Sequence, residues 1–179
     1  GAGVVISQYY GARKEKEVGR AVQTAMLMTL VLGVLFTFLG LAITPFLLNM
    51  MNTPDDIMPD AYTYLSTYFS GIIGLMFYNI GSGILRAVGD SRRPFYFLVI
   101  SAVINTVLDL VFVVKFQMGV FGVALATIIA QGVSALLVIL TLLRSRECIR
   151  LVVKEWQLDG DILKKIFRVG LPAALQMAI

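Results

Sequence analysis

The sequence predicts an all-α protein that crosses a membrane several times, and three features indicate this fold class. Hydrophobic residues make up 58% of the 179 residues and charged ones only 15%, which excludes an ordinary soluble domain. Uncharged runs recur over residues 21–54, 61–85 and 116–143. Each is long enough, at about 1.5 Å per residue, to cross a hydrocarbon core of about 30 Å. Basic residues also gather in alternate connections between the runs, as they do in polytopic membrane proteins.

Four complete spanning helices are expected, separated by charged or turn-forming connections. They cover residues 21–49, 61–85, 95–114 and 120–143. Residues 1–10 read as the end of an earlier span, and residues 170–179 read as the start of a later one. Both ends of the sequence are therefore expected to lie inside helices. None of the runs has the short apolar core and cleavage site of a signal peptide.

The charge of the connections predicts how the helices are oriented in the membrane. Fourteen of the fifteen Lys and Arg residues lie in the connections 12–20, 86–94 and 144–169, and only Lys115 lies on the other side. Because cytoplasmic loops accumulate basic residues, these three connections are expected to be cytoplasmic in a plasma (inner) membrane. The longest connection has apolar residues spaced three or four apart, which predicts short amphipathic helices on the membrane surface with Trp156 as an interfacial anchor.

The span 95–114 contains one carboxylate, Asp109, and it dominates the functional interpretation. An ionised Asp at the centre of a spanning helix costs about 2.5–3.5 kcal/mol, so Asp109 is expected to face a polar cavity. Asn105 lies one turn before it and Ser101 one turn before that, on the same helix face. A carboxylate beside a neutral amide oxygen suits a bound proton or a small hard cation such as Na⁺. The alternative is a structural pair that is hydrogen-bonded to neighbouring helices.

Two other spans carry polar stripes that could line the same cavity. In 61–85 the stripe could equally be a helix–helix seam, because several glycines there permit close backbone approach; its members are Tyr64, Gly71, Tyr78, Asn79 and Ser82. In 120–143 the hydroxyls could instead bond to carbonyls of their own helix, although Gln131 is harder to explain that way. This second stripe consists of Thr127, Gln131, Ser134 and Thr141.

The sequence offers no catalytic constellation. There is no histidine and only one cysteine, Cys148, so no Cys/His metal site is expected within these residues. No phosphate-binding GxxxxGK[ST] loop or Ser/His pair occurs. The acidic cluster in the proline-containing connection 52–60 reads as a solvated turn. We therefore expect neither an enzyme nor an organic cofactor.

Five motifs, in order and spread over nearly the whole chain, resemble the multidrug and toxic compound extrusion (MATE) family. They are GAGVVISQYYGAR (1–13), GILRAVGDSRRP (83–94), INTVLDLVFV (104–113), GVFGVALATIIAQ (119–131) and GLPAALQ (170–176). The resemblance implies a fold of twelve helices in two six-helix lobes. The chain would then hold the end of helix 2 and helices 3 to 6 in an N-terminal lobe (1–143), a cytoplasmic inter-lobe linker (144–169), and the start of helix 7 in the C-terminal lobe (170–179).

The resemblance also implies roles for particular residues. Asp109, Asn105 and Thr127 would contribute to a coupling-cation site, with Na⁺ as a possible ion there. Tyr64, Asn79 and Ser82 would line the cavity, although Ser82 stands where some members have an amide. A further acid of this site, on helix 1, lies outside the chain.

The leading hypothesis is a secondary active antiporter that exports small organic compounds, often cations, in exchange for H⁺ or Na⁺. Its partners would be its substrate and membrane lipid, and it is expected to be monomeric. A flippase for lipid-linked sugars is the first alternative, but the complete spans contain no Lys or Arg to bind a pyrophosphate. A membrane-embedded lipid transferase would need a compact metal-binding motif, which the connections 12–20 and 86–94 lack. A purely structural subunit would leave Asp109 without a purpose.

Overall fold

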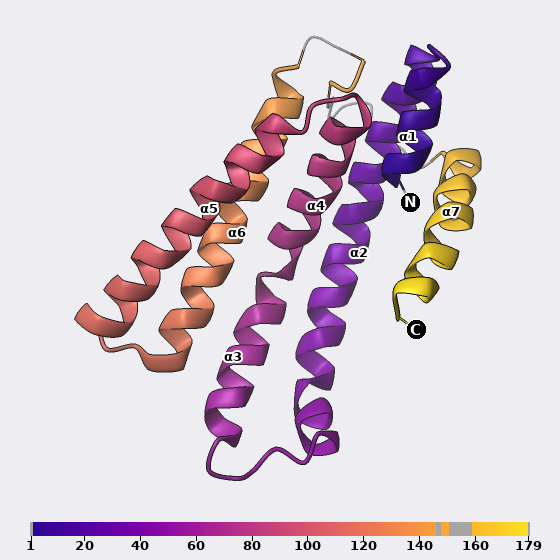
Figure 1. The fold of residues 1–179 in the computed structure, drawn as a ribbon. Helices are drawn as coiled ribbons and strands as arrows, with labels where there is room; N and C mark the ends of the chain where they lie inside the picture. Colours follow the sequence, from indigo (N-terminus) through magenta and orange to yellow (C-terminus); the bar gives the residue numbers. More distant parts are fainter. Residues whose placement is uncertain (1, 146–147, 151–158, 179) are drawn as a thin grey trace.

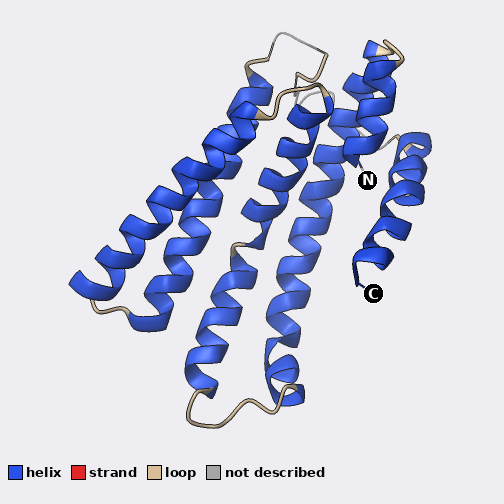
Figure 2. Cartoon of the chain, viewed as in Figure 1, coloured by secondary structure: helices blue, strands red, loops and turns tan. Residues whose placement is uncertain are grey.

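In the computed structural model, which describes residues 2–145, 148–150 and 159–178, the described chain folds almost entirely into helices (Figures 1 and 2). Their bounds are α1 (Ala2–Gly11), α2 (Glu15–Met50), α3 (Met58–Ser70), α4 (Ile72–Ala87), α5 (Arg92–Leu110), the π-helix η1 (Val111–Lys115), α6 (Gly119–Leu143) and α7 (Gly160–Ala178). The fold is the expected all-α one.

Three helical segments are long and apolar enough to cross a membrane, and the bent pair α3 and α4 makes a fourth. The spans are Glu15–Met50, Arg92–Lys115 and Gly119–Leu143, together with Met58–Ser70 plus Ile72–Ala87. Many of their large apolar side chains are exposed; that of Phe38, for example, is 69% exposed. Apolar side chains that face outward along such helices are solvated by lipid. The chain is therefore part of a multi-pass membrane protein.

The first connection is shorter than the sequence predicted. Residues 12–20 were expected to form a charged loop, but α2 begins at Glu15 and includes most of them. Glu15 and Glu17 lie in the first turn of α2, where negative charge stabilises the positive end of the helix dipole. The turn itself needs Arg13 in a left-handed conformation, with φ of 59°.

The second predicted span, 61–85, is not one straight helix. It breaks at Gly71, and α3 and α4 meet there at 45°. A Cβ at Gly71 would collide with the Ile128 side chain of α6, so the break lies where the backbone comes closest to its neighbour. Glycine is also the weakest ordinary helix former. Periodicity alone could not reveal the bend, because both halves keep helical spacing.

The third span extends beyond the predicted 95–114 at both ends and finishes in a π-helix. In η1 the backbone N–H of Phe116 donates to the carbonyl of Val111, five residues earlier. The turn into α6 then uses two left-handed residues, Gln117 and Gly119. π-helical turns are rare and often occur at functional sites, and this one begins two residues after Asp109.

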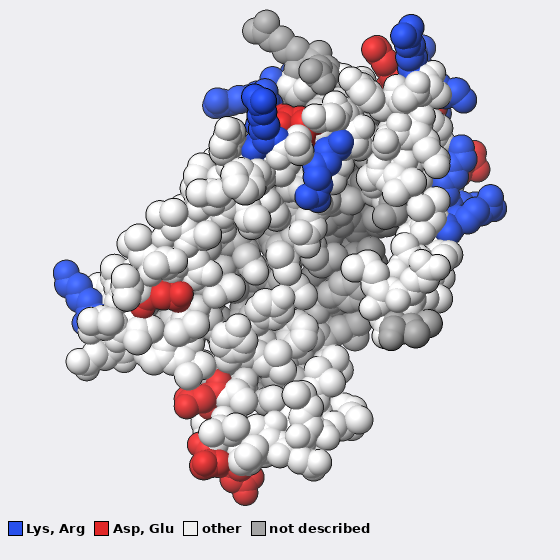
Figure 3. Space-filling view, viewed as in Figure 1, with Lys and Arg blue, Asp and Glu red and all other residues white. Residues whose placement is uncertain are grey.

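The buried core lies at one end of the bundle, where α1, α2, α4, α6 and α7 meet. Its fully buried side chains include Ile6, Met26, Ile84 and Leu142. Lys and Arg side chains gather over this end of the molecule, with some Asp and Glu among them, whereas the far end beyond α2 and α3 shows acidic side chains alone (Figures 1 and 3). We call the first of these the basic end. This distribution is the one that the sequence predicts for a cytoplasmic end.

Helix α7 packs against α1 and α2 near the basic end. Arg20 forms an ion pair with Asp159, just before α7. Lys165 Nζ donates to the Tyr9 hydroxyl at 2.6 Å and lies 4.9 Å from the centre of that ring. The helix runs without interruption across residues 169–170, where the predicted linker would meet the next lobe. The predicted anchor Trp156 lies outside the described residues.

Candidate functional site

A buried hydrogen bond fixes the register between α5 and α6. The Ser101 hydroxyl donates to the carbonyl of Ala130 at 2.9 Å. Ser101 is buried, so the face of α5 that carries it lies against α6. Asn105 and Asp109 follow on that face at successive turns. The sequence therefore places the carboxylate at a helix–helix contact.

Several of the predicted site residues have a buried oxygen with no hydrogen-bond donor among the described residues. These atoms are Asn105 Oδ1, Asp109 Oδ1, Gln131 Oε1 and Ser82 Oγ. Buried polar atoms in proteins nearly always have a partner, and an unsatisfied one costs about 1–3 kcal/mol or more. The described residues of neighbouring helices donate no hydrogen bond to the buried Oδ1 atoms of Asn105 and Asp109.

Helices α5 and α6 run antiparallel, so the position of each residue along the bundle axis can be measured from the Ser101–Ala130 bond. Asn105 and Thr127 lie four and three residues beyond it, toward the Lys115 end, which is about 6 Å and about 4.5 Å. The two side chains are therefore nearly level. Asp109 lies one turn further, about 12 Å from the reference bond. The Thr127 hydroxyl donates to the Val123 carbonyl of its own helix at 3.0 Å, which leaves its oxygen free to accept.

Tyr64 can be placed in the same way, because Gly71 of the α3–α4 break lies against Ile128 of α6. Tyr64 is seven residues before Gly71, at about the height of Asp109. The two residues are on helices that pack on α6, but the Tyr64 side chain is 40% exposed. Tyr64 thus shares the level of the carboxylate without being enclosed beside it.

Asn79 and Ser82 lie in the other half of the bundle. Gly81 packs against Val138 of α6, eight residues from Ala130 toward the basic end. That separation puts Ser82 about 24 Å from Asp109 along the bundle axis. The structure therefore divides the predicted set into two groups: Asp109, Asn105, Thr127 and Tyr64 toward the Lys115 end, and Asn79 and Ser82 toward the basic end, with Gln131 between them.

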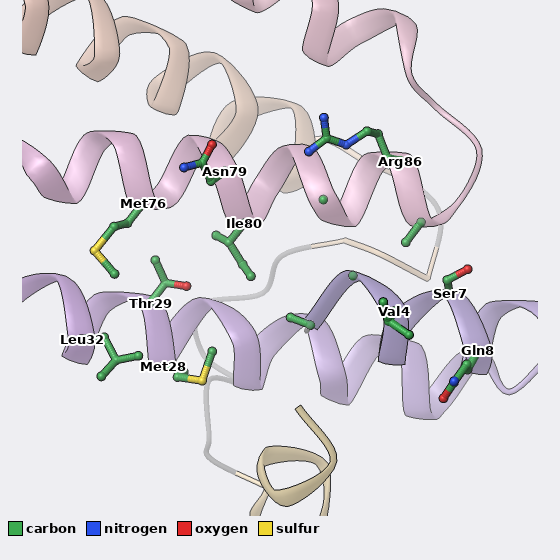
Figure 4. A pocket seen from close by; sticks show the side chains of 14 residues that line it. Val4, Ser7, Gln8, Met28, Thr29, Leu32, Met76, Asn79, Ile80 and Arg86 are labelled. Carbon is green, nitrogen blue, oxygen red and sulfur yellow. The ribbon is translucent and has the colours of Figure 1, made fainter. Parts of the chain in front are cut away.

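Asn79 instead lines a separate cavity of about 760 Å³ between α1, α2 and α4. Figure 4 shows Thr29 of α2 and Asn79 of α4 on facing helices, with Arg86 further along α4. Ser7 and Gln8 of α1 complete its polar lining. The sequence did not reveal these α1 and α2 residues as site candidates. Only their polarity could have indicated them, because they are isolated polar residues in apolar runs.

The site near Asp109 offers only oxygen ligands. No group of three or more His, Cys, Asp or Glu side chains that could hold a metal ion occurs among the described residues. Asp109, Asn105 and Thr127 provide one carboxylate, one amide oxygen and one hydroxyl, which are ligands that hard cations prefer. The same carboxylate can take up a proton. These groups can therefore bind a hard cation or a proton.

Fold and site together define a multi-pass α-helical membrane protein with a partly buried carboxylate on one of its spans. Sequence comparison then gives the family. The family described as MatE matches residues 1–111, more than half of the chain. The chain belongs to this family.

Individual relatives support the same family assignment. The chain is 32% identical over 177 residues to the "Probable multidrug resistance protein YpnP" of Bacillus subtilis, covering 98% of this chain and 39% of the relative. A crystal structure of MATE in the bent conformation shares 29% identity with a TM-score of 0.93, over 99% of this chain and 40% of that one. An inward-facing multidrug resistance MATE family transporter of the MOP superfamily shares 29% identity with a TM-score of 0.90, over 97% and 40%. The chain thus spans about two fifths of the proteins that it matches.

Proposed function

We propose that this chain is part of a secondary active antiporter that exports small organic compounds, often cations, in exchange for H⁺ or Na⁺. The observation that carries the proposal is the pair of unsatisfied buried oxygens, Asn105 Oδ1 and Asp109 Oδ1, one turn apart on a membrane span. The names of the relatives support drug export as the direction of transport.

The pair explains how a cation would be recognised. A proton on Asp109 turns a carboxylate into a donor, and Asn105 Oδ1 is an acceptor in need of one. A Na⁺ ion would instead be bound by both oxygens together with the Thr127 hydroxyl. Either ion neutralises the charge in the span, which removes most of the cost of holding it there.

Binding must favour one of two conformations if it is to drive transport. The π-helix η1 directly follows the α5 segment that carries Asp109. Because a π turn leaves an extra residue in the helix, the end of α5 has a second, α-helical arrangement within reach. In the proposed cycle the ion-bound and ion-free carboxylate favour different packings of this end of α5 against α6.

The remaining parts of the proposal concern the whole protein. It acts as a transporter rather than as an enzyme, and it needs no cofactor besides the coupling ion. It lies in the plasma membrane with the basic end in the cytoplasm. Its partners are the exported compound and membrane lipid, with no nucleic acid, and it works as a monomer.

The test measures ion-driven efflux in proteoliposomes and compares the full-length wild-type protein with its Asp109→Asn variant. Imposing a pH gradient and a Na⁺ gradient separately identifies the coupling ion. Asp109→Asn should abolish efflux driven by that ion, while the control Asp55→Asn, in the exposed connection after α2, should retain it. Unchanged efflux by Asp109→Asn at equal protein amounts would remove Asp109 from the mechanism.

A further inference from the structure

A second large cavity, of about 950 Å³, opens at the basic end between the α4–α5 connection and the C-terminus of α6. Its charged wall includes Arg92 and Arg93 at the start of α5 and Arg144 at the end of α6. Nothing in the proposed transport cycle uses this cavity, because Asp109 lies toward the other end of the bundle.

Among the described residues, the cavity lining carries more positive than negative charge. Asp90 is the one acidic residue of that described lining, and it forms an ion pair with Arg93 at 3.4 Å. The Asp90 carboxylate also accepts the backbone N–H of Arg93 at 3.2 Å. Arg92 and Arg144 have no carboxylate partner among the described residues. Two guanidinium groups thus remain to bind an anion, for which their planar forks are well suited.

The first turn of α5 borders the same space. Ser91 precedes the helix and lines the cavity, and the Asp90 carboxylate caps the helix by accepting the Arg93 N–H. Pro94 has no N–H to offer. The guanidinium groups of Arg92 and Arg144 are therefore the groups that favour a phosphate.

The position of the cavity identifies the source of that phosphate. The rest of its lining mixes polar Thr141 and Ser145 with apolar side chains such as Phe97. Next to the cavity, α5 exposes apolar side chains such as Leu98 and Val99, which give an amphiphile a contact that a free phosphate ion cannot use. Arg92 begins one membrane span and Arg144 directly follows another, so the cavity lies at head-group depth. Phe95 and Tyr96, both exposed in the next turn of α5, suit the same interface.

We propose that this cavity binds the phosphate of an anionic phospholipid from the leaflet at the basic end. Arg92 and Arg144 contact the phosphate, and the acyl chains lie along the exposed apolar face of α5. Basic pockets between spanning helices are a recognised way of holding anionic head groups. Because α4, α5 and α6 all contribute to the cavity, the lipid would stabilise the contact among these helices.

The binding test uses the full-length protein in detergent, titrated with phosphatidylglycerol or phosphatidylcholine and followed by native mass spectrometry. At about 1 kcal/mol per basic residue near the surface, each arginine is worth about fivefold in affinity. The Arg92→Gln/Arg144→Gln double variant should therefore bind phosphatidylglycerol about 30-fold more weakly, with phosphatidylcholine unaffected. The matched control Lys16→Gln, an exposed basic residue of α2 outside the cavity, should change the affinity less than about twofold.

Three results would overturn the proposal. Equal affinity for the two lipids would mean that charge is not recognised, and an equal loss in Lys16→Gln would mean that only the general surface charge acts. Displacement of phosphatidylglycerol by inorganic phosphate at comparable concentration and constant ionic strength would make this a site for the free ion.

If the double variant does not fold, photolabelling of the wild-type protein tests whether the lipid binds in this cavity. A phosphatidylglycerol with a photoactivatable head group should label peptides that contain residues 85–97 or 141–149, and a tenfold excess of unlabelled phosphatidylglycerol should suppress that labelling. Labelling confined to other parts of the protein would contradict the proposal.

Discussion

The hydroxyl of Tyr78 on α4 donates a hydrogen bond of 2.7 Å to the carbonyl of Pro94 in the first turn of α5. This bond ties the start of the Asp109 helix to a neighbour other than α6. Together with the Ser101–Ala130 bond it holds α5 at two heights, one near the basic end and one near mid-span. The height of Asp109 in the bundle depends on both bonds.

Removing the Tyr78 hydroxyl should loosen the beginning of α5 without opening the core. Tyr78→Phe keeps the ring but loses one hydrogen bond, which is worth about 0.5–1.5 kcal/mol net. We expect the free energy of unfolding of the full-length protein in detergent to fall by about 1 kcal/mol. The control is Tyr62→Phe, an exposed tyrosine of α3, which should change it by less than about 0.5 kcal/mol. Equal losses in both variants would contradict a specific role for the α4–α5 bond.

The glycines of α4 should differ sharply in their tolerance of a methyl group. A Cβ at Gly81 would collide with the buried side chain of Val138 on α6. Overpacking of this kind costs about 1–3 kcal/mol. Gly83 is two residues away in the same helix and has no atom within 4 Å of an added Cβ, so the alanine there should stabilise the helix by about 0.5–1 kcal/mol.

Thermal unfolding of Gly81→Ala and Gly83→Ala measures this difference directly. The first variant should unfold at a lower temperature than the wild type and the second at the same or a higher temperature. If both unfolded alike, the close approach of α4 and α6 at Gly81 would be wrong.

The attachment of α7 should weaken in acid because of Asp159. Its pKa is lowered from the usual value, first by the backbone N–H of Ile162 and also by the charge of Arg20, with burial acting in the opposite direction. A lowered pKa in the folded state stabilises the protein above the unfolded-state pKa of about 3.9. That contribution is lost as the pH falls below 3.9 and through the lower folded-state pKa.

Hydrogen exchange along α7, corrected for the intrinsic pH dependence of exchange, checks this prediction. Protection of residues 160–168 should decrease at acid pH in the wild type, and Asp159→Asn should show the low protection already at neutral pH. The neighbouring exposed Asp161→Asn is the matched control and should resemble the wild type at neutral pH. Full protection in Asp159→Asn would show that packing against α1 and α2 holds α7 without the Arg20–Asp159 ion pair.

The sequence predicted most of the fold because lipid imposes a simple rule: each uncharged run long enough to cross the bilayer must be helical. It did not predict where helices bend. The polar stripe of 61–85 had two interpretations, a cavity lining or a close helix contact, and the structure puts Gly71, Gly74 and Gly81 of this span against α6. Only the partner helix distinguishes these cases, and periodicity within one helix carries no information about the partner.

The sequence could group candidate site residues within one helix but not between helices. Spacing along one helix is enough to group Asp109 with Asn105, since residues four apart share a face. Grouping residues of different helices requires their relative heights. Asn79 and Ser82 belong to the same predicted span as Tyr64, yet packing of Gly81 on Val138 puts them toward the basic end. The resemblance to the family suggested that grouping, but a resemblance carries no information about distances between helices.

Asn105 should govern the affinity for the coupling ion if its unsatisfied oxygen receives the proton or the cation. A hydrogen bond to a charged group is worth about 1.5–3 kcal/mol, which corresponds to about ten- to hundredfold in affinity. Asn105→Ala should therefore shift the ion concentration for half-maximal efflux by at least about tenfold, while the maximal rate at saturating ion is largely kept. The control Thr106→Val changes the next residue, whose hydroxyl bonds only to the Ala102 carbonyl of its own helix among the described residues, and should leave the ion dependence unchanged. Efflux kinetics in proteoliposomes give both quantities. An unchanged ion dependence in Asn105→Ala would mean that Asp109 binds its ion without this neighbour, and that the amide oxygen is satisfied by another group of the complete protein.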